Sequence, residues 1–86
     1  MNPNDVAFYI NRGNRYDEIG ETQKAINDYK KSLELNPNYS EGLNNLAIMY
    51  CKERDYNTAL KYFEKALYLN PDDQIIKKNI KMLKEW

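Results

Sequence analysis

The sequence contains no histidine and only one cysteine, Cys51. Without histidine it lacks the commonest general base and metal ligand. A single thiol then leaves neither a nucleophile–base pair nor a Cys/His metal cluster. Only three glycines occur in 86 residues, and none belongs to a glycine-rich phosphate loop. We therefore expect no enzymatic activity, no cofactor and no bound metal.

An excess of charge of either sign is also missing, because 13 basic residues balance 13 acidic ones. This balance gives no electrostatic reason to expect nucleic acid or an anionic membrane as the main partner. No apolar run approaches the ~18 residues of a membrane-spanning helix, and the first residues lack a signal-peptide pattern. The single cysteine excludes an internal disulfide and indicates a reducing compartment, so a cytoplasmic location is expected.

The three prolines, Pro3, Pro37 and Pro71, are spaced 34 residues apart, and each follows an asparagine. Proline ends a helix, and a fixed period of this size is typical of a repeat array. Aligning residues 6–39 with residues 40–73 gives eight identical pairs, mostly at apolar or turn positions. The pairs are Asn11/Asn45, Tyr16/Tyr50, Ala25/Ala59, Lys31/Lys65, Leu33/Leu67, Leu35/Leu69, Asn36/Asn70 and Pro37/Pro71.

Apolar residues recur at spacings of three and four in four segments, which predicts amphipathic helices. The stripes are Val6, Tyr9, Ile10, Gly13 and Tyr16; Ala25, Ile26, Tyr29, Leu33 and Leu35; Leu43, Leu46, Ala47 and Tyr50; Ala59, Leu60, Phe63, Ala66 and Leu67. Asn38, with Glu41 three residues later, predicts a capping box at the third helix. A last helix is expected to run from a cap at Asp72 or Asp73 to Trp86. The sequence thus predicts an all-α fold of two antiparallel helix hairpins and one extra helix.

The two hairpins resemble the tetratricopeptide repeat family, whose pattern is W-x2-L-G-x2-Y, then A-x3-F, then P. The matching residues are Tyr9, Gly13, Tyr16, Ala25, Tyr29 and Pro37, and then Leu43, Leu46, Ala47, Tyr50, Ala59, Phe63 and Pro71. The resemblance implies a right-handed α-solenoid, a single domain over residues 1–86, with repeats at 6–39 and 40–73 and a capping helix at 74–86. Small residues at the glycine and alanine positions would let the two helices of a hairpin approach closely.

The sequence departs from the family pattern at Arg12, which replaces a leucine-like residue, and at Arg54, which occupies the position of Gly20. Gly20 is a natural helix stop, because glycine accepts the left-handed conformation. If Arg54 has to adopt that conformation, the cost is about 1 kcal/mol.

In this family the first helices of successive repeats line a concave groove that holds an extended peptide. The resemblance therefore implies a protein–protein interaction module whose partner is a protein or peptide. Matching positions place these residues on the groove: Ile10, Asn14 and Asp17; Asn44, Ile48, Cys51 and Lys52; Lys78 and Met82. Asn11, Asn45 and Asn79 recur beside them and could pair with a peptide backbone, because asparagine both donates and accepts. The alternative is that these three asparagines are simply solvated.

In co-chaperone relatives, such a groove holds a C-terminal carboxylate with lysine, arginine and asparagine side chains. Asn14 and Asn45 match the two asparagines. The basic positions instead hold Ile10, Ile75 and Asn79, and Lys78 is one residue out of register, so we do not expect carboxylate capture.

The two ends of the array differ from its middle. Leu46 and Met49 should dock onto the preceding repeat, whereas the equivalent residues of the first unit are Arg12 and Arg15, as solubility requires of an end repeat. The last helix keeps apolar docking residues and carries lysines where a partner helix would pack: Ile76, Ile80 and Leu83, and Lys77, Lys81 and Lys84.

Two alternatives to peptide binding remain open. One is a structural or engineered scaffold fragment with no ligand of its own. The other is self-association through Phe8 and the repeat ends, although a monomer is expected rather than a homo-oligomer.

Overall fold

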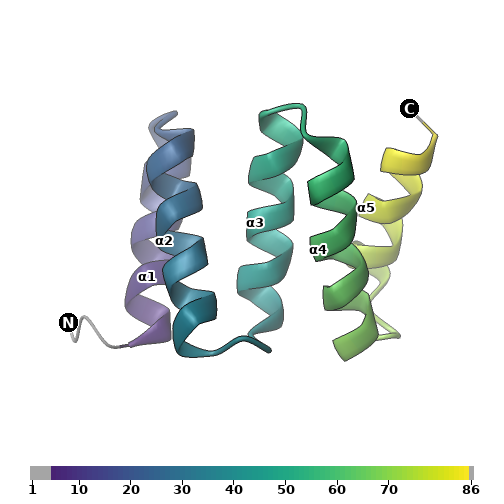
Figure 1. The fold of residues 1–86 in the computed structure, drawn as a ribbon, viewed down its shortest axis with the longest axis horizontal. Coiled ribbons are helices and arrows are strands. Elements are labelled where there is room, and N and C mark those ends of the chain that lie inside the picture. Colours follow the sequence, from purple (N-terminus) through teal and green to yellow (C-terminus); the bar gives the residue numbers. More distant parts are fainter. Residues whose placement is uncertain (1–4, 86) are drawn as a thin grey trace.

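The computed structural model describes residues 5–85, which form five α-helices and no strand. The helices are α1 (Val6–Glu18), α2 (Thr22–Leu35), α3 (Ser40–Lys52), α4 (Tyr56–Leu69) and α5 (Gln74–Lys84). Consecutive helices pack against one another along the row (Figure 1). The predicted all-α fold of two antiparallel hairpins and one extra helix is confirmed. The predicted end of the last helix, Trp86, lies outside the described residues.

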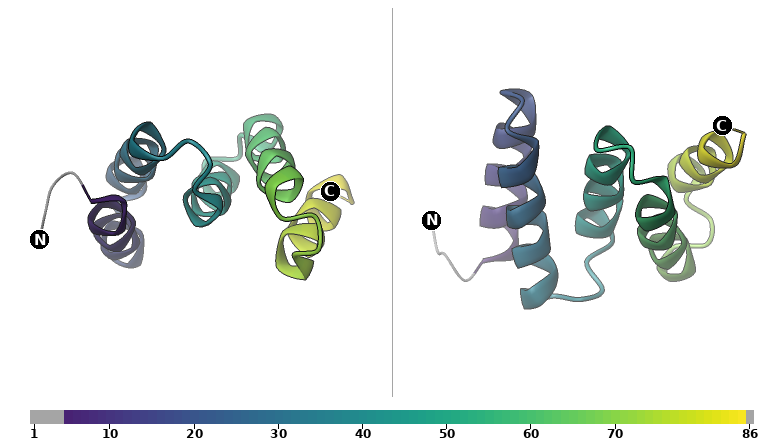
Figure 2. Two further views of the ribbon diagram at one scale, coloured as in Figure 1. Left: turned by 90° about the horizontal axis from the view of Figure 1, so that it is seen from below. Right: turned by 45° about the horizontal axis from the view of Figure 1, so that its top comes forward.

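The helices form two layers. Seen end-on, α1, α3 and α5 lie on one side of the row, and α2 and α4 lie on the other (Figure 2). The molecule measures 39 × 26 × 17 Å along its principal axes. Within residues 5–85, no helix is both long and apolar enough to cross a bilayer.

The first hairpin closes tightly because Gly13 has no side chain. A Cβ atom at this position would lie 2.7 Å from Cε1 of Tyr29 on the facing helix. At the corresponding contacts Ala25, Ala47 and Ala59 are fully buried. The predicted role of the small residues in helix approach is confirmed.

Buried residues form two core clusters: one joins the two repeats, and the other joins the second repeat to α5. The first contains Ile10, Ala25, Ile26, Tyr29, Leu46 and Met49. The second contains Leu43, Ala47, Ala59, Phe63, Ala66, Ile76 and Ile80. As predicted, Leu46 and Met49 of α3 pack onto the first hairpin, and Ile76 and Ile80 of α5 pack onto the second.

At the N-terminal edge, Arg12 forms a two-pronged ion pair that the sequence did not suggest. Its Nε donates to Asp28 Oδ2 at 2.8 Å, and its Nη2 donates to Asp28 Oδ1 at 2.7 Å. Asp28 is buried in α2, and the guanidinium also lies over the rings of Phe8, Tyr9 and Tyr16. The prediction that charged side chains cover this edge therefore holds for Arg12, whose charge is matched by a buried carboxylate.

Two helix starts can be compared with the sequence. Asp73 Oδ1 accepts hydrogen bonds from the amides of Ile75 and Ile76, so the predicted cap of α5 is confirmed. The capping box predicted for α3 is wrong. The N-cap of α3 is Tyr39, which makes no side-chain cap, and Asn38 instead donates its amide to Asn36 Oδ1 in the inter-repeat turn.

The turn inside each hairpin requires a left-handed residue. Gly20 has φ 81°, and Arg54 at the equivalent position has φ 61°. In each turn the amide of the next residue bonds back to the helix, from Glu21 to the Tyr16 carbonyl at 2.8 Å and from Asp55 to Tyr50 at 2.9 Å. The left-handed conformation predicted for Arg54 is confirmed.

We expect Arg54→Gly to stabilise the protein by about 0.5–1 kcal/mol, because glycine adopts positive φ without strain. The reciprocal change, Gly20→Ala, should cost about 1 kcal/mol through the backbone alone, since no atom lies within 4 Å of a Cβ built there. Urea denaturation followed by circular dichroism measures both. A destabilised Arg54→Gly variant would contradict this account of the turn.

Candidate functional site

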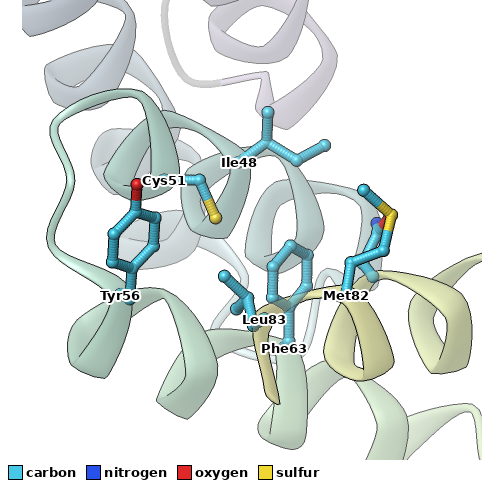
Figure 3. A pocket seen from close by; sticks show the side chains of 7 residues that line it. Ile48, Cys51, Tyr56, Phe63, Met82 and Leu83 are labelled. Atoms are coloured by element: carbon cyan, nitrogen blue, oxygen red, sulfur yellow. The ribbon is translucent and has the colours of Figure 1, made fainter. Parts of the chain in front are cut away.

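An apolar pocket of about 200 Å³ opens between α3 and α5. Its lining residues are Ile48 and Cys51 from α3, Tyr56 and Phe63 from α4, and Asn79, Met82 and Leu83 from α5. In Figure 3, Tyr56 and Cys51 lie on one side of the pocket and Met82 on the other, with the Phe63 ring below Ile48. The pocket therefore lies on the face built by α1, α3 and α5, hereafter the α1–α3–α5 face.

The corresponding place in the first repeat is polar. The Tyr29 hydroxyl donates to Asn14 Oδ1 at 2.5 Å. Tyr29 is equivalent to Phe63, and Asn14 is equivalent to Ile48. The amide NH2 group of Asn14 has no hydrogen-bond acceptor within residues 5–85, so it can donate to a ligand.

Burial raises the pKa of Tyr29 to about 12, and the nearby negative charge of Asp17 adds to the effect. The folded protein thus favours the neutral phenol, which is the form that donates to Asn14.

Two polar contacts link neighbouring helices across the face. Lys52 Nζ of α3 forms an ion pair with Asp17 Oδ1 of α1. Asn79 Nδ2 of α5 donates to Asn44 Oδ1 of α3 at 3.5 Å. Both contacts join residues about one repeat apart, so they hold the helices of the face in register.

The structure brings most of the predicted groove residues together on this face. Ile48, Asn79 and Met82 line the pocket, and Cys51 lies beside them as predicted. Asn45 is partly buried, and Lys78 is exposed with no ion-pair partner within residues 5–85.

Two predicted groove residues lie elsewhere. Ile10 is 2% exposed and belongs to the first core cluster, so its predicted place in the groove is wrong. Its side chain instead fills the space beneath α3. A Cβ atom at position 42, where the sequence has glycine, would lie 3.5 Å from Cδ1 of Ile10. Asn11 is exposed at the N-terminal edge, where it lines a hollow with Phe8, Arg12 and Arg15. The three asparagines therefore do not form a continuous ladder: Asn79 pairs with Asn44, and Asn11 faces outward.

Sequence reasoning missed the floor of the pocket. Phe63 and Leu83 were assigned to packing and Tyr56 was given no role, yet all three line the pocket. The sequence did contain a signal for this pocket. Where the first repeat has Tyr29 and Asn14, which form a hydrogen bond, the second repeat has Phe63 and Ile48, which leave an apolar surface.

Known proteins share this architecture and its repeats. A family model described as Tetratricopeptide repeat matches residues 6–39 and 40–73. The chain belongs to the tetratricopeptide repeat family. The two repeats inferred from the proline spacing are those that the family model matches, with α5 following the second.

Relatives with this repeat include longer proteins. The chain is 36% identical over 83 residues to the Protein SGT1 homolog of Bos taurus, covering 96% of this chain and 25% of that protein. It is 35% identical over 74 residues to Tetratricopeptide repeat protein 6 of Homo sapiens, covering 86% of this chain and 14% of the relative. The chain thus spans a quarter or less of these two relatives.

A solved structure with the same fold is described as the first TPR of Spaghetti (RPAP3) bound to HSP90 peptide SRMEEVD. It superposes with a TM-score of 0.92 over 98% of this chain and 67% of that chain, at 18% sequence identity. At this identity the likeness concerns the arrangement of the helices.

The raised pKa of Tyr29 predicts a loss of stability at alkaline pH. Tyrosine in the unfolded chain ionises near pH 10. The unfolded state therefore loses its proton first, and stability falls between about pH 10 and the folded pKa of about 12. At pH 8 the free energy of unfolding of Tyr29→Phe should be about 1 kcal/mol lower than that of the unmodified protein, because the hydrogen bond is missing. This difference should shrink above about pH 10. Tyr68→Phe, at a ring that is 85% exposed, is the matched control. Urea unfolding from pH 8 to 12 measures the difference, and a deficit that stays constant with pH would contradict the assignment.

Cys51 should react slowly with thiol reagents. Burial raises the pKa of its thiol, so less of the reactive thiolate forms at pH 8. Alkylation by iodoacetamide, followed by mass spectrometry, should be about tenfold slower in the folded protein than in 6 M urea. Equal rates in the two states would show that the pocket does not shield the sulfur.

Proposed function

We propose that this protein is a non-catalytic interaction module whose α1–α3–α5 face, the predicted concave face, binds an extended segment of a partner protein. The observation that carries the proposal is the apolar pocket between α3 and α5. The pocket would hold one apolar side chain of the segment, because six of its seven lining residues are aliphatic, aromatic or sulfur-containing.

Polar groups beside the pocket support an extended ligand rather than an isolated small molecule. Asn14 lies on the first repeat, the partly buried Asn45 lies on α3 of the second repeat, and the paired Asn44 and Asn79 lie near the pocket. Amide groups of this kind pair with a peptide backbone whatever its side chains. The peptide-bound structure of the first TPR of Spaghetti, with the same fold, further supports the assignment.

The ligand need not end in a carboxylate. Neither Ile10 nor Asn79 offers a positive charge, and Lys52 is held by Asp17. Lys78 forms no ion pair within residues 5–85, so an acidic side chain next to the apolar one would find a partner there.

The proposal is tested by selecting binders from a library of linear heptapeptides. Selected peptides should carry Leu, Met, Ile or Val at one shared position. Isothermal titration should show affinity lower by about tenfold in Met82→Glu, which places a charge at the pocket rim, and by a smaller factor in Ile48→Ala. Ile19→Glu is the control, since Ile19 is an exposed isoleucine at the end of α1. Peptides whose affinity is unchanged in both pocket variants would overturn the assignment of the face.

A further inference from the structure

The last helix, α5, carries an unbalanced positive charge in a chain whose net charge is zero. Within Gln74–Lys84 there are four lysines and no acidic residue. None of the four forms an ion pair within residues 5–85. Lys77, Lys81 and Lys84 follow one another at i, i+4 and i+7, so they form a single stripe along the helix.

This stripe borders apolar surface on α4. Two hollows of about 380 and 570 Å³ lie between α4 and α5, and they share Leu67, Ile80 and Lys84. Tyr68, which is 85% exposed, lies beside them. We call Leu67, Tyr68, Lys77, Ile80, Lys81 and Lys84 the α4–α5 edge. Two acidic residues, Glu64 and Glu85, also line its hollows.

The stripe is in the correct register to receive a helix. In the second repeat, the residues 34 positions earlier are Leu43, Ala47 and Tyr50, and they pack against α4. Within residues 5–85 no further helix packs on this stripe of α5, which is the last helix of the row in Figures 1 and 2. The backbone geometry therefore admits one more antiparallel helix, while the side chains require that helix to bring negative charge.

We propose that the α4–α5 edge binds an amphipathic helix of a partner protein, with acidic residues at i, i+4 and i+7 facing the lysine stripe. Small or aliphatic residues on the adjacent face of that helix would cover Leu67 and Ile80. The bound helix takes the place on α5 that α4 has on α3, and it completes a third hairpin from outside the chain. This surface is separate from the α1–α3–α5 face.

Two features favour an acidic helix over other occupants. A second copy of the chain stacking head to tail would bring Arg12 and Arg15 against three lysines, which is repulsive. An anionic bilayer could also contact the lysines. However, the apolar residues Leu67 and Ile80 lie in the hollows between two helices, where the side chains of a helix reach them better than a flat membrane surface does.

The experiment uses a lactam-stapled helical peptide of about 15 residues, with Glu at i, i+4 and i+7 and Leu and Ala on the adjacent face. A second peptide has Gln in place of the three Glu residues. Fluorescence anisotropy measures affinity, and amide chemical shifts in NMR locate the binding site. We expect the Glu peptide to shift Leu67, Lys77 and Ile80, and to leave Ile48 and Met82 unaffected.

Matched double variants separate the stripe from general charge. The double variant Lys77→Glu with Lys81→Glu should lower the affinity for the Glu peptide by about tenfold or more. The control variant Lys61→Glu with Lys65→Glu, an i, i+4 pair exposed on α4, should change that affinity by less than about twofold. Circular dichroism confirms that both variants fold.

The proposal is overturned if the Glu peptide fails to bind at about millimolar concentration, if the Gln peptide binds equally, or if the stripe variant loses no affinity. It is also overturned if the protein binds phosphatidylserine vesicles but not the peptide, or if sedimentation shows the edge occupied by a second copy. Because NMR distinguishes the two surfaces, a negative result at the α4–α5 edge would not affect the separate proposal for the α1–α3–α5 face.

Discussion

The close approach of two helices at Gly13 is the contact on which the first repeat depends. The Tyr29 ring occupies the space that a Cβ at position 13 would need, and it can do so only because the glycine leaves α1 bare there. With the ring seated against α1, its hydroxyl emerges at the level of Asn14 and donates to it. A core packing contact thereby fixes the orientation of a polar group on the α1–α3–α5 face.

The two repeats use this shared geometry for different chemistry. At the same two positions the first repeat has a hydrogen-bonded tyrosine and asparagine, and the second has Phe63 and Ile48, which line an open apolar pocket. Tyr29 and Phe63 are each 1% exposed, so either ring fills the core of its hairpin. One face can therefore present a polar half and an apolar half, which suits a peptide that carries one apolar anchor beside a plain stretch of backbone.

Much of the fold could be predicted from periodicity alone. The spacing of Pro37 and Pro71 sets the register, and the register assigned Leu46, Met49, Ile76 and Ile80 correctly to the contacts between repeats. Helix starts were harder, because the inter-repeat turn could be closed in more than one way. Asn38 donates its backbone amide to Asn36 Oδ1 within that turn, α3 begins after Tyr39, and the box expected at Asn38 does not form.

The candidate site was less predictable than the fold because family positions do not say which side chains remain exposed. The family resemblance placed Ile10 on the groove, but a branched apolar side chain gains more by burial beneath α3 than by exposure. The pairing of Arg12 with Asp28 was equally hidden, since it joins residues 16 apart on different helices and neither position is charged in the second repeat.

The two ends of the array each have a docking face that no further helix covers within residues 5–85, and charged side chains occupy the two faces in different ways. At the N-terminal edge, Arg12 satisfies a buried carboxylate and covers three aromatic rings, so the charge belongs to the structure of the first repeat. At the α4–α5 edge, Lys77, Lys81 and Lys84 form no ion pair within residues 5–85, although Glu64 and Glu85 line the same hollows. Both edges resist stacking on another basic surface, but within residues 5–85 the α4–α5 edge has three lysines without an ion pair, whereas the N-terminal edge has only Arg15 in that state. The asymmetry makes the C-terminal edge the place where an acidic partner gains most by binding, because its carboxylates displace water from the lysines and break no existing ion pair.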